Sequence, residues 1–236
     1  MHSFLVRRPI AHRGLHDGNK HRFENSRSAF DAAIGGNFGI ELDVQLSADG
    51  TAMVFHDPTL ERLTAEAGAL ADRTAGELRH VRLGGTQDHI PTLAETLEQI
   101  AGRTTVVIEM KDNGARNREL ARAVASDLET YDGPAAVMSF SHDLLAAFGE
   151  TGNDTPLGLT AGGIGEHAMA EHNKALALGI SFVSYDVKAL PNRFVDHVRK
   201  ALHLPVITWT VRTPQDVEAT RLHADQMTFE DFVPEG

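Results

Sequence analysis

The chain has 236 residues, with 22 Lys and Arg against 33 Asp and Glu, a formal net charge of −11 and no cysteine. Disulfides, zinc thiolate sites and a cysteine nucleophile are therefore excluded. Nucleic acid is not expected as a partner, because its recognition needs a basic surface and the cations here are outnumbered and scattered. An acidic protein can still bind a phosphate ester where local cations and a divalent metal supply positive charge.

The start of the chain gives an expectation about location. Residues 1–9 hold an apolar run of only three residues, whereas a secretory signal needs roughly 7–15. No stretch approaches the roughly 18 apolar residues of a membrane span. We therefore expect a cytoplasmic protein with no stable membrane insertion.

Short β-rich apolar runs alternate with amphipathic helical patterns along the whole chain. In chain order, the predicted strands are Pro9–Arg13, Phe38–Leu46, Ala52–His56, Thr104–Met110, Ala135–Phe140, Thr155–Thr160, Ile180–Asp186, Pro205–Val211 and Ala224–Phe229. The predicted helices are Ser26–Ile34, Leu93–Ile100, Asn117–Glu129, His142–Glu150, Glu166–Leu178, Asn192–Leu202 and Pro214–His223. This alternation predicts a parallel sheet flanked by helices.

Two of the nine predicted strands are too close together to be parallel neighbours. Residues 47–51 alone separate the second from the third, whereas a parallel crossover needs about a dozen residues. The Asp49-Gly50 pair within this link is a hairpin signal. One of the two strands is therefore predicted to be a hairpin arm, which leaves eight for a barrel. Residues 57–91 then interrupt the alternation of strands and helices. They indicate a small insertion over one end of a single domain spanning 1–236.

Ionisable residues interrupt or end four of the predicted strands. They are His12 and Arg13 after the first strand, Glu41 and Asp43 within the second, His56 and Asp57 after the third, and Glu109 and Lys111 at the end of the fourth. Buried parallel strands are normally continuous apolar runs, and an α/β barrel places its active site at the carboxyl ends of its strands. Alternation along a strand sends both members of the Glu41/Asp43 and Glu109/Lys111 pairs to one side of the sheet.

These residue types suit phosphoryl chemistry. The carboxylates of Glu41, Asp43 and Glu109 form an oxygen set typical of Mg²⁺ or Ca²⁺ sites. His12 and His56 come from different strands and could act as general base and acid. Arg13 and Lys111 would neutralise phosphate charge.

A series of motifs, in order, resembles the glycerophosphodiester phosphodiesterases. It consists of Ile10-Ala11-His12-Arg13-Gly14, Glu24-Asn25-Ser26, residues 39–46, residues 54–60, residues 90–93, Glu109-Met110-Lys111, Ser139-Phe140 and Trp209-Thr210-Val211. The resemblance covers nearly the whole chain and is densest over residues 10–111. It implies a TIM (β/α)8 barrel with a short insertion after the third strand segment.

The resemblance also implies roles for the residues singled out above. His12 and His56 match the acid/base pair, Glu41, Asp43 and Glu109 the ligands of Mg²⁺ or Ca²⁺, and Arg13 and Lys111 the phosphate-side cations. Trp209, and more weakly Phe140, would form a wall for the substrate's alcohol group. The implied activity is the hydrolysis of small glycerophosphodiesters to glycerol phosphate and an alcohol, with attack on phosphorus by water or by the glycerol 2-hydroxyl.

Several alternatives stay open at this point. A lysophospholipase D or a cyclising phospholipase-type enzyme would keep the site and change the substrate, and a catalytically dead barrel would only bind phosphate ligands. Apolar surface on residues 57–91 would favour a lipid. The C-terminus also departs from the family, which usually ends in an apolar strand and a Thr-Asp-Xaa-Pro-like sequence. Residues 224–234 are more polar, with Phe229-Glu230 near the expected Thr-Asp.

Overall fold

Eight parallel strands close into a barrel in the computed structural model, which describes residues 3–234. Each strand pairs with its neighbour in the chain, and β1 pairs with both β2 and β9, so the sheet closes on itself. The barrel predicted from the strand–helix alternation is thereby confirmed. Its strands are β1 (Ile10–Ala11), β2 (Gly39–Leu46), β4 (Val106–Met110), β5 (Ala135–Ser139), β6 (Leu157–Ala161), β7 (Phe182–Asp186), β8 (Val206–Val211) and β9 (Gln226–Phe229).

The ninth strand, β3 (Ala52–Val54), forms the predicted hairpin. It runs antiparallel to β2, with Val54 opposite Val44 and Ala52 opposite Leu46. Because β3 folds back along β2, the residues after it return to the level of the middle of β2. The amide of Phe55 donates a 3.0 Å hydrogen bond to the carbonyl of Asp43. His56 is thus brought close to Asp43 although it does not follow a barrel strand.

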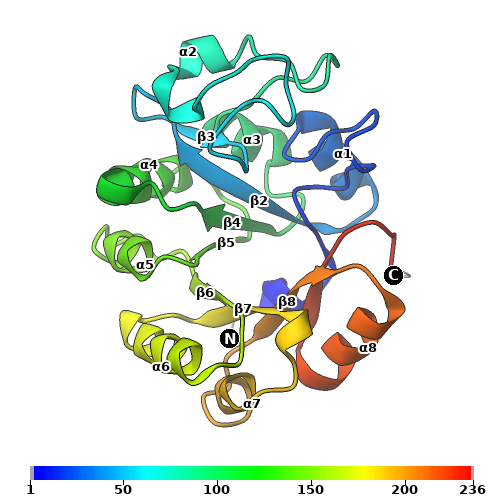
Figure 1. Cartoon of the computed structure of the whole chain (residues 1–236), viewed down its shortest axis with the longest axis vertical. Helices are drawn as coiled ribbons and strands as arrows, with labels where there is room; N and C mark the ends of the chain where they lie inside the picture. The colour runs from blue at the N-terminus through cyan, green and yellow to red at the C-terminus, as the bar shows by residue number, and fades with distance from the viewer. Residues whose placement is uncertain (1–2, 235–236) are drawn as a thin grey trace.

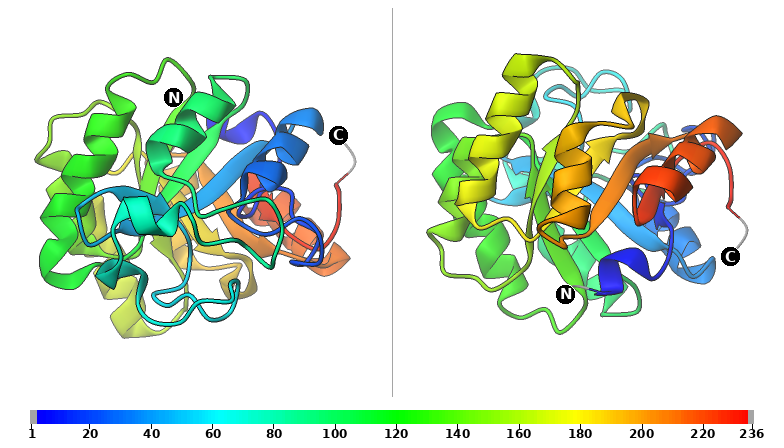
Figure 2. Two further views of the ribbon diagram at one scale, coloured as in Figure 1. Left: turned by 90° about the horizontal axis from the view of Figure 1, so that it is seen from above. Right: turned by 90° about the horizontal axis from the view of Figure 1, so that it is seen from below.

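Helices surround the strands on every side (Figures 1 and 2). They are α1 (Arg27–Gly35), α2 (Ala75–Leu78), α3 (Leu93–Ile100), α4 (Asn117–Leu128), α5 (His142–Gly149), α6 (Glu166–Ala175), α7 (Arg193–Lys200) and α8 (Pro214–His223). Short 3₁₀ turns are η1 (Ser3–Val6), η2 (Leu70–Asp72), η3 (Gly114–Arg116), η4 (Leu176–Leu178) and η5 (Val187–Ala189). Side-chain caps fix several starts: the hydroxyl of Ser26 accepts from the amide of Ala29, and Thr92 and Thr213 form capping boxes.

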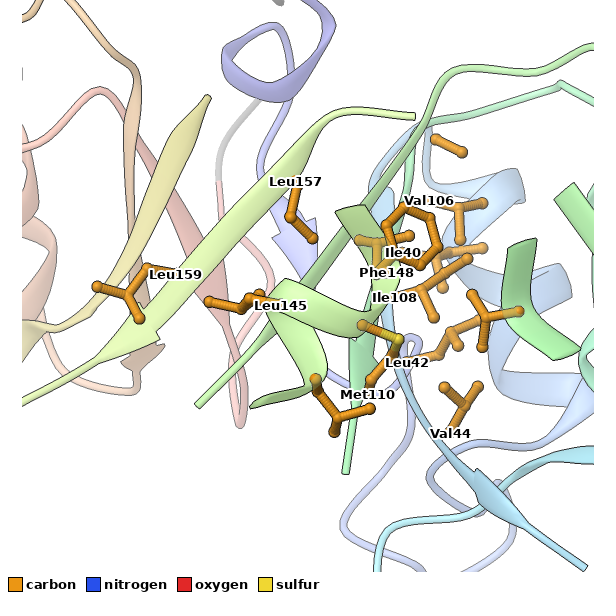
Figure 3. Packing of buried hydrophobic residues seen from close by; sticks show 14 of the residues in the cluster. Ile40, Leu42, Val44, Val106, Ile108, Met110, Leu145, Phe148, Leu157 and Leu159 are labelled. Carbon is orange, nitrogen blue, oxygen red and sulfur yellow. The ribbon is translucent and has the colours of Figure 1, made fainter. Parts of the chain in front are cut away.

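The alternation of side chains along each strand separates two environments. The even-numbered residues Ile40, Leu42 and Val44 of β2 pack outward with the helices, together with Ile108 of β4 (Figure 3). The odd-numbered positions of β2 and β4 face the barrel interior. Inside, an apolar floor is formed by Leu5 of η1 with Ile10, Val107, Ala136, Met138, Phe182 and Ile207. The buried carboxylates border this floor, with Glu41 beside Val107 and Glu109 beside Met138 in the strand register.

Residues 57–91, at the top of Figure 1, carry a separate small core. The buried side chains are Leu60, Leu63, Leu70, Leu78, Val81, Leu83 and Ile90, which pack on Phe23, Met53 and Phe55. All seven large apolar residues of this segment are therefore used within the fold. Among residues 3–234, we find no helix with the length and apolar character needed to cross a membrane.

Candidate active site

Three carboxylates converge inside the barrel. Strand register places Asp43 of β2 directly beside Glu109 of β4, and Glu41 lies two residues earlier on the same face of β2. One oxygen from each of the three lies within 4.8 Å of the others, and all three side chains are buried. Three hard oxygen donors this close form a set that can hold a divalent cation.

Two cations lie among these carboxylates. The ammonium of Lys111 is 2.9 Å from Asp43 Oδ1 and 2.5 Å from Glu109 Oε1. The guanidinium of Arg13 is 3.2 Å from Asp43 Oδ2, and the Arg13 amide donates a 2.9 Å hydrogen bond to Glu41 Oε2. The two positive charges thus balance part of the negative charge of the triad.

The charges of the site shift its pKa values in opposite directions. Burial raises the pKa of Glu41 well above its usual value, and the charges of Asp43 and Glu109 raise it further. Burial also raises the pKa of Glu109. For Asp43, burial is outweighed by Lys111 and Arg13, so its pKa falls to about 2. Asp43 is therefore the carboxylate that keeps its charge most strongly, and a cation added beside Glu41 and Glu109 would favour their ionised forms.

Each of the two predicted histidines has its Nδ1 atom held by a carboxylate. His56 Nδ1 is 2.7 Å from Asp57 Oδ1. His12 Nδ1 is hydrogen-bonded to Glu230, the first residue after β9. His12 Nε2 lies 3.9 Å from Glu41 Oε2, on the side of the carboxylate triad. Burial lowers the pKa of both histidines, so both rings favour the neutral form more than an exposed histidine does.

The segment after β1 supports the site from one side. Asn25 is buried and donates from Nδ2 to Asp43 Oδ2 at 2.9 Å, while its own amide donates to the carbonyl of Arg13 at 2.9 Å. Glu24 Oε1 accepts a 2.7 Å hydrogen bond from Arg13 Nη1. Arg13 and Asn25 both have positive φ, at 56° and 54°. A backbone conformation with positive φ is uncommon for residues other than glycine, and here it is held by the surrounding contacts.

Two aromatic residues face each other at the ends of β5 and β8. The rings of Phe140 and Trp209 make an edge-to-face contact with centroids 5.3 Å apart. Trp209 Nε1 donates to the carbonyls of Ser184 at 3.2 Å and Ala161 at 3.3 Å, which fixes the indole. Phe140 is 51% exposed, and Gly162 lies against Trp209. The pair offers an apolar surface near the carboxyl ends of β5 and β8.

The structure brings the predicted carboxylates, histidines and cations together as one site, while the roles assigned to them stay predictions. Phe140 and Trp209 contact each other at the ends of their own strands. Glu230 was missed, because a polar end to the last strand gave no sign of its partner 218 residues away. The Glu24-Asn25-Ser26 string suggests a loop and helix start with a secondary role in steadying Arg13 or the metal ligands, and Glu24 indeed bonds to Arg13 and Asn25 to Asp43. Arg62 was also missed, and it binds both Asp57 and Glu24. Arg62 is one of four arginines within residues 57–91, and only its place six residues after His56 sets it apart in the sequence.

The fold and this cluster define a class of protein: an α/β-barrel phosphodiesterase with an acidic metal-type site. Residues 12–230 match the model of the glycerophosphoryl diester phosphodiesterase family. The chain belongs to that family and is a phosphoric diester hydrolase.

Curated relatives agree with this assignment. A glycerophosphodiester phosphodiesterase of Bacillus altitudinis is 30% identical over 94% of this chain and 84% of its own length. Human glycerophosphodiester phosphodiesterase 1 is 27% identical over 64% of this chain and 48% of that protein.

Solved structures share the barrel. An Oleispira antarctica phosphodiesterase, solved with the product sn-glycerol-3-phosphate, superposes with a TM-score of 0.84 at 22% identity, covering 97% of this chain and 94% of that one. A Thermotoga maritima glycerophosphodiester phosphodiesterase gives a TM-score of 0.75 at 27% identity, covering 93% of this chain and 92% of that one.

Proposed function

We propose that this chain hydrolyses small glycerophosphodiesters by acid/base catalysis between His12 and His56, with a divalent Mg²⁺ or Ca²⁺ held by Glu41, Asp43 and Glu109. The observation that carries the proposal is the convergence of two carboxylate-held histidines on one buried carboxylate triad. A site that only bound phosphate would have no need for both rings.

The donor set fits a hard divalent cation. Three buried carboxylates carry more negative charge than Arg13 and Lys111 offset, and burial of uncompensated charge is unfavourable. A bound cation would supply polarisation of the phosphate oxygens. Asp43 would provide the most fully charged ligand, and Arg13 and Lys111 would provide fixed positive charge beside the phosphate group.

The hydrogen bonds to Nδ1 leave Nε2 of each histidine for the substrate. One ring accepts a proton from the attacking hydroxyl, and the other donates a proton to the leaving alcohol. Asp57 and Glu230 keep each ring in the tautomer and orientation that this exchange requires. Because burial lowers the pKa of both rings, the neutral form needed by a general base is available near neutral pH.

The surroundings favour a small substrate over a lipid. Large apolar side chains of residues 57–91 are buried in the core of the insertion, so they do not supply an acyl-chain surface. Phe140 and Trp209 remain as a limited apolar wall for the alcohol group. The glycerol phosphate bound by the Oleispira antarctica protein supports the same product class here.

The test is hydrolysis of glycerophosphocholine and glycerophosphoethanolamine after EDTA treatment, with Mg²⁺ or Ca²⁺ restored. We expect metal-dependent release of glycerol phosphate that is lost in His12→Ala and Glu41→Ala. Activity that is indifferent to EDTA, or that survives in His12→Ala, would overturn the mechanism. Turnover of lysophospholipid but of neither diester would assign a lipid substrate instead.

A further inference from the structure

Arg62, in the insertion, joins two carboxylates that belong to different parts of the site. Its Nε lies 2.5 Å from Asp57 Oδ2 and its Nη2 lies 2.9 Å from Asp57 Oδ1. On its other side, Nη1 lies 2.9 Å from Glu24 Oε2 and Nη2 lies 2.7 Å from Glu24 Oε1. The guanidinium therefore makes two paired contacts at once, which only its planar fork allows.

The two carboxylates differ in how much they depend on Arg62. Glu24 is buried and has further bonds from Arg13 at 2.7 Å and from Asn19 Nδ2 at 2.8 Å. Within the described chain, the Asp57 side chain is bonded only by His56 and twice by Arg62. Removing Arg62 therefore leaves Glu24 fixed, whereas the Asp57 carboxylate becomes free to rotate away from His56.

Loss of Arg62 leaves the buried Glu24 with its bonds from Arg13 and Asn19, so no buried carboxylate is left without a partner. The Arg62 side chain is itself 43% exposed, which limits what its ion pairs contribute to the free energy of unfolding. The core of the insertion is apolar and lies elsewhere. The position of Arg62 is thus explained better by orientation of Asp57 than by stabilisation of the chain.

We propose that Arg62 is a positioning residue for His56: it locks the Asp57 carboxylate against Nδ1 and so keeps Nε2 aimed into the barrel. Glu24 is the rigid anchor from which Arg62 acts, since Glu24 is itself held by Arg13. The insertion then contributes to catalysis through one side chain. This inference rests on the proposed function in assigning His56 to the acid/base pair.

The experiment compares Arg62→Gln and Arg62→Lys with the control Arg79→Gln. Arg79 lies in the same segment, is 58% exposed and pairs with Glu95 only at 3.5 Å. With glycerophosphoethanolamine at saturating metal, we expect Arg62→Gln to lower kcat by about 10–100-fold with little change in KM. Arg62→Lys keeps the charge without the fork and should fall in between. Arg79→Gln should match the parent.

A double-mutant cycle separates positioning from a general loss of structure. In the Asp57→Ala background, Arg62→Gln should cause almost no further loss of kcat, because the carboxylate that Arg62 holds against His56 is already absent. In the Glu230→Ala background, which lacks the partner of His12 and keeps both rings, Arg62→Gln should cause its full loss. A full loss in both backgrounds would overturn the proposal.

A second readout needs no turnover. The ¹⁵N spectra of the two imidazole rings report tautomer and hydrogen bonding at each nitrogen. We expect Arg62→Gln to shift the signals of His56 and leave those of His12 in place, and unshifted His56 signals would contradict the inference. If the parent protein hydrolysed no diester, the proposed function would fail, while these spectra would still test whether Arg62 holds His56.

Discussion

Glu230 is hydrogen-bonded to Nδ1 of His12, across the closure of the barrel between β9 and β1. The strand register explains this contact, because Ala11 lies opposite Phe229 at the end of each strand, and His12 and Glu230 are the residues that follow. Glu230 is also bound by Arg212 at 2.9 Å. Burial alone would raise the pKa of Glu230, but the hydrogen bond to His12 and the charges around it, including that of Arg212, bring the pKa down to about 2. Glu230 therefore faces His12 as a carboxylate over the whole range of physiological pH.

The first prediction concerns this pair. Glu230→Ala should lower kcat by about 10–100-fold, because the His12 ring loses the partner that sets its tautomer and orientation. KM should change much less. Steady-state kinetics with a glycerophosphodiester give both values. Asp231→Asn is the control, since Asp231 is exposed and only touches Arg212 at 3.4 Å. Equal activity in Glu230→Ala and the parent would show that His12 needs no such partner.

The second prediction concerns Asn25, which bonds to Asp43 at 2.9 Å. Asn25→Ala should weaken divalent metal affinity by about 10–100-fold, because the carboxylate loses the hydrogen bond that orients it. Calorimetric titration of metal into the protein measures this directly. Asn37→Ala is a matched control: Asn37 also has positive φ, 59° against 54°, but lies at the end of α1. Equal affinities in the two variants would remove Asn25 from the metal-binding shell.

The third prediction is a pH effect on stability. Burial raises the pKa of Asp127, on α4, to about 6. Its pKa is above the unfolded value of about 3.9, so the native state binds this proton more tightly. The stabilising effect of that proton is lost as pH rises from about 4 through about 6. Asp127→Asn should therefore raise the free energy of unfolding at pH 7.5 by about 1 kcal/mol, after allowance for partial exposure.

At pH 4, the same variant should unfold like the parent, because Asp127 is then protonated in the native state. Thermal unfolding at the two pH values is the measurement. Asp132→Asn, at an exposed position shortly after α4, is the control. A gain at pH 4 equal to that at pH 7.5 would show that the effect is not one of titration.

The fourth prediction tests the packing of the insertion. A Cβ on Gly84 would lie 1.8 Å from Cζ of the buried Phe23, whereas a Cβ on Gly85 would meet nothing within 4 Å. Both glycines have positive φ. Gly84→Ala should therefore cost about 1–3 kcal/mol more stability than Gly85→Ala, since only the first adds a clash. Denaturant unfolding of both variants gives the difference, and similar midpoints would contradict the packing.

The fifth prediction concerns the aromatic wall. Phe140→Ala should raise KM for glycerophosphocholine by up to about 10-fold with kcat little changed, because the ring contributes binding shared by substrate and transition state. Leu222→Ala, at a position 62% exposed on α8, is the control for loss of a surface apolar side chain. An unchanged KM in Phe140→Ala would place the alcohol group elsewhere.

The barrel could be predicted because its signals are local and repeated. Each apolar run is followed by a helical pattern, and the short link at Asp49-Gly50 identifies the hairpin without any tertiary information. The clustering of Glu41, Asp43 and Glu109 could be predicted because parallel strands present their carboxyl ends at one side. The predicted helix through Leu178 instead ends at Ala175 and continues as a 3₁₀ turn before Gly179, whose φ is 75°.

What could not be predicted depends on pairing between distant residues. Glu230 and His12 meet only because the last strand closes on the first, and no local pattern specifies which residue after β9 reaches the ring. Arg62 lies in a segment with little regular structure, where the spacing of residues in the sequence does not define the direction in which a side chain points. Asn25 reaches Asp43 through a positive φ that sequence permits but does not require.

The closure of the barrel between β9 and β1 has a consequence for the order of events during synthesis. In a growing chain, His12 is synthesised well before β9, the strand that brings Glu230 to it. Until β9 docks, β1 and β8 each present an unpaired edge. The proposed acid/base pair therefore becomes complete only in the step that pairs these two strand edges, so we expect a chain without docked β9 to lack both activity and protection from aggregation.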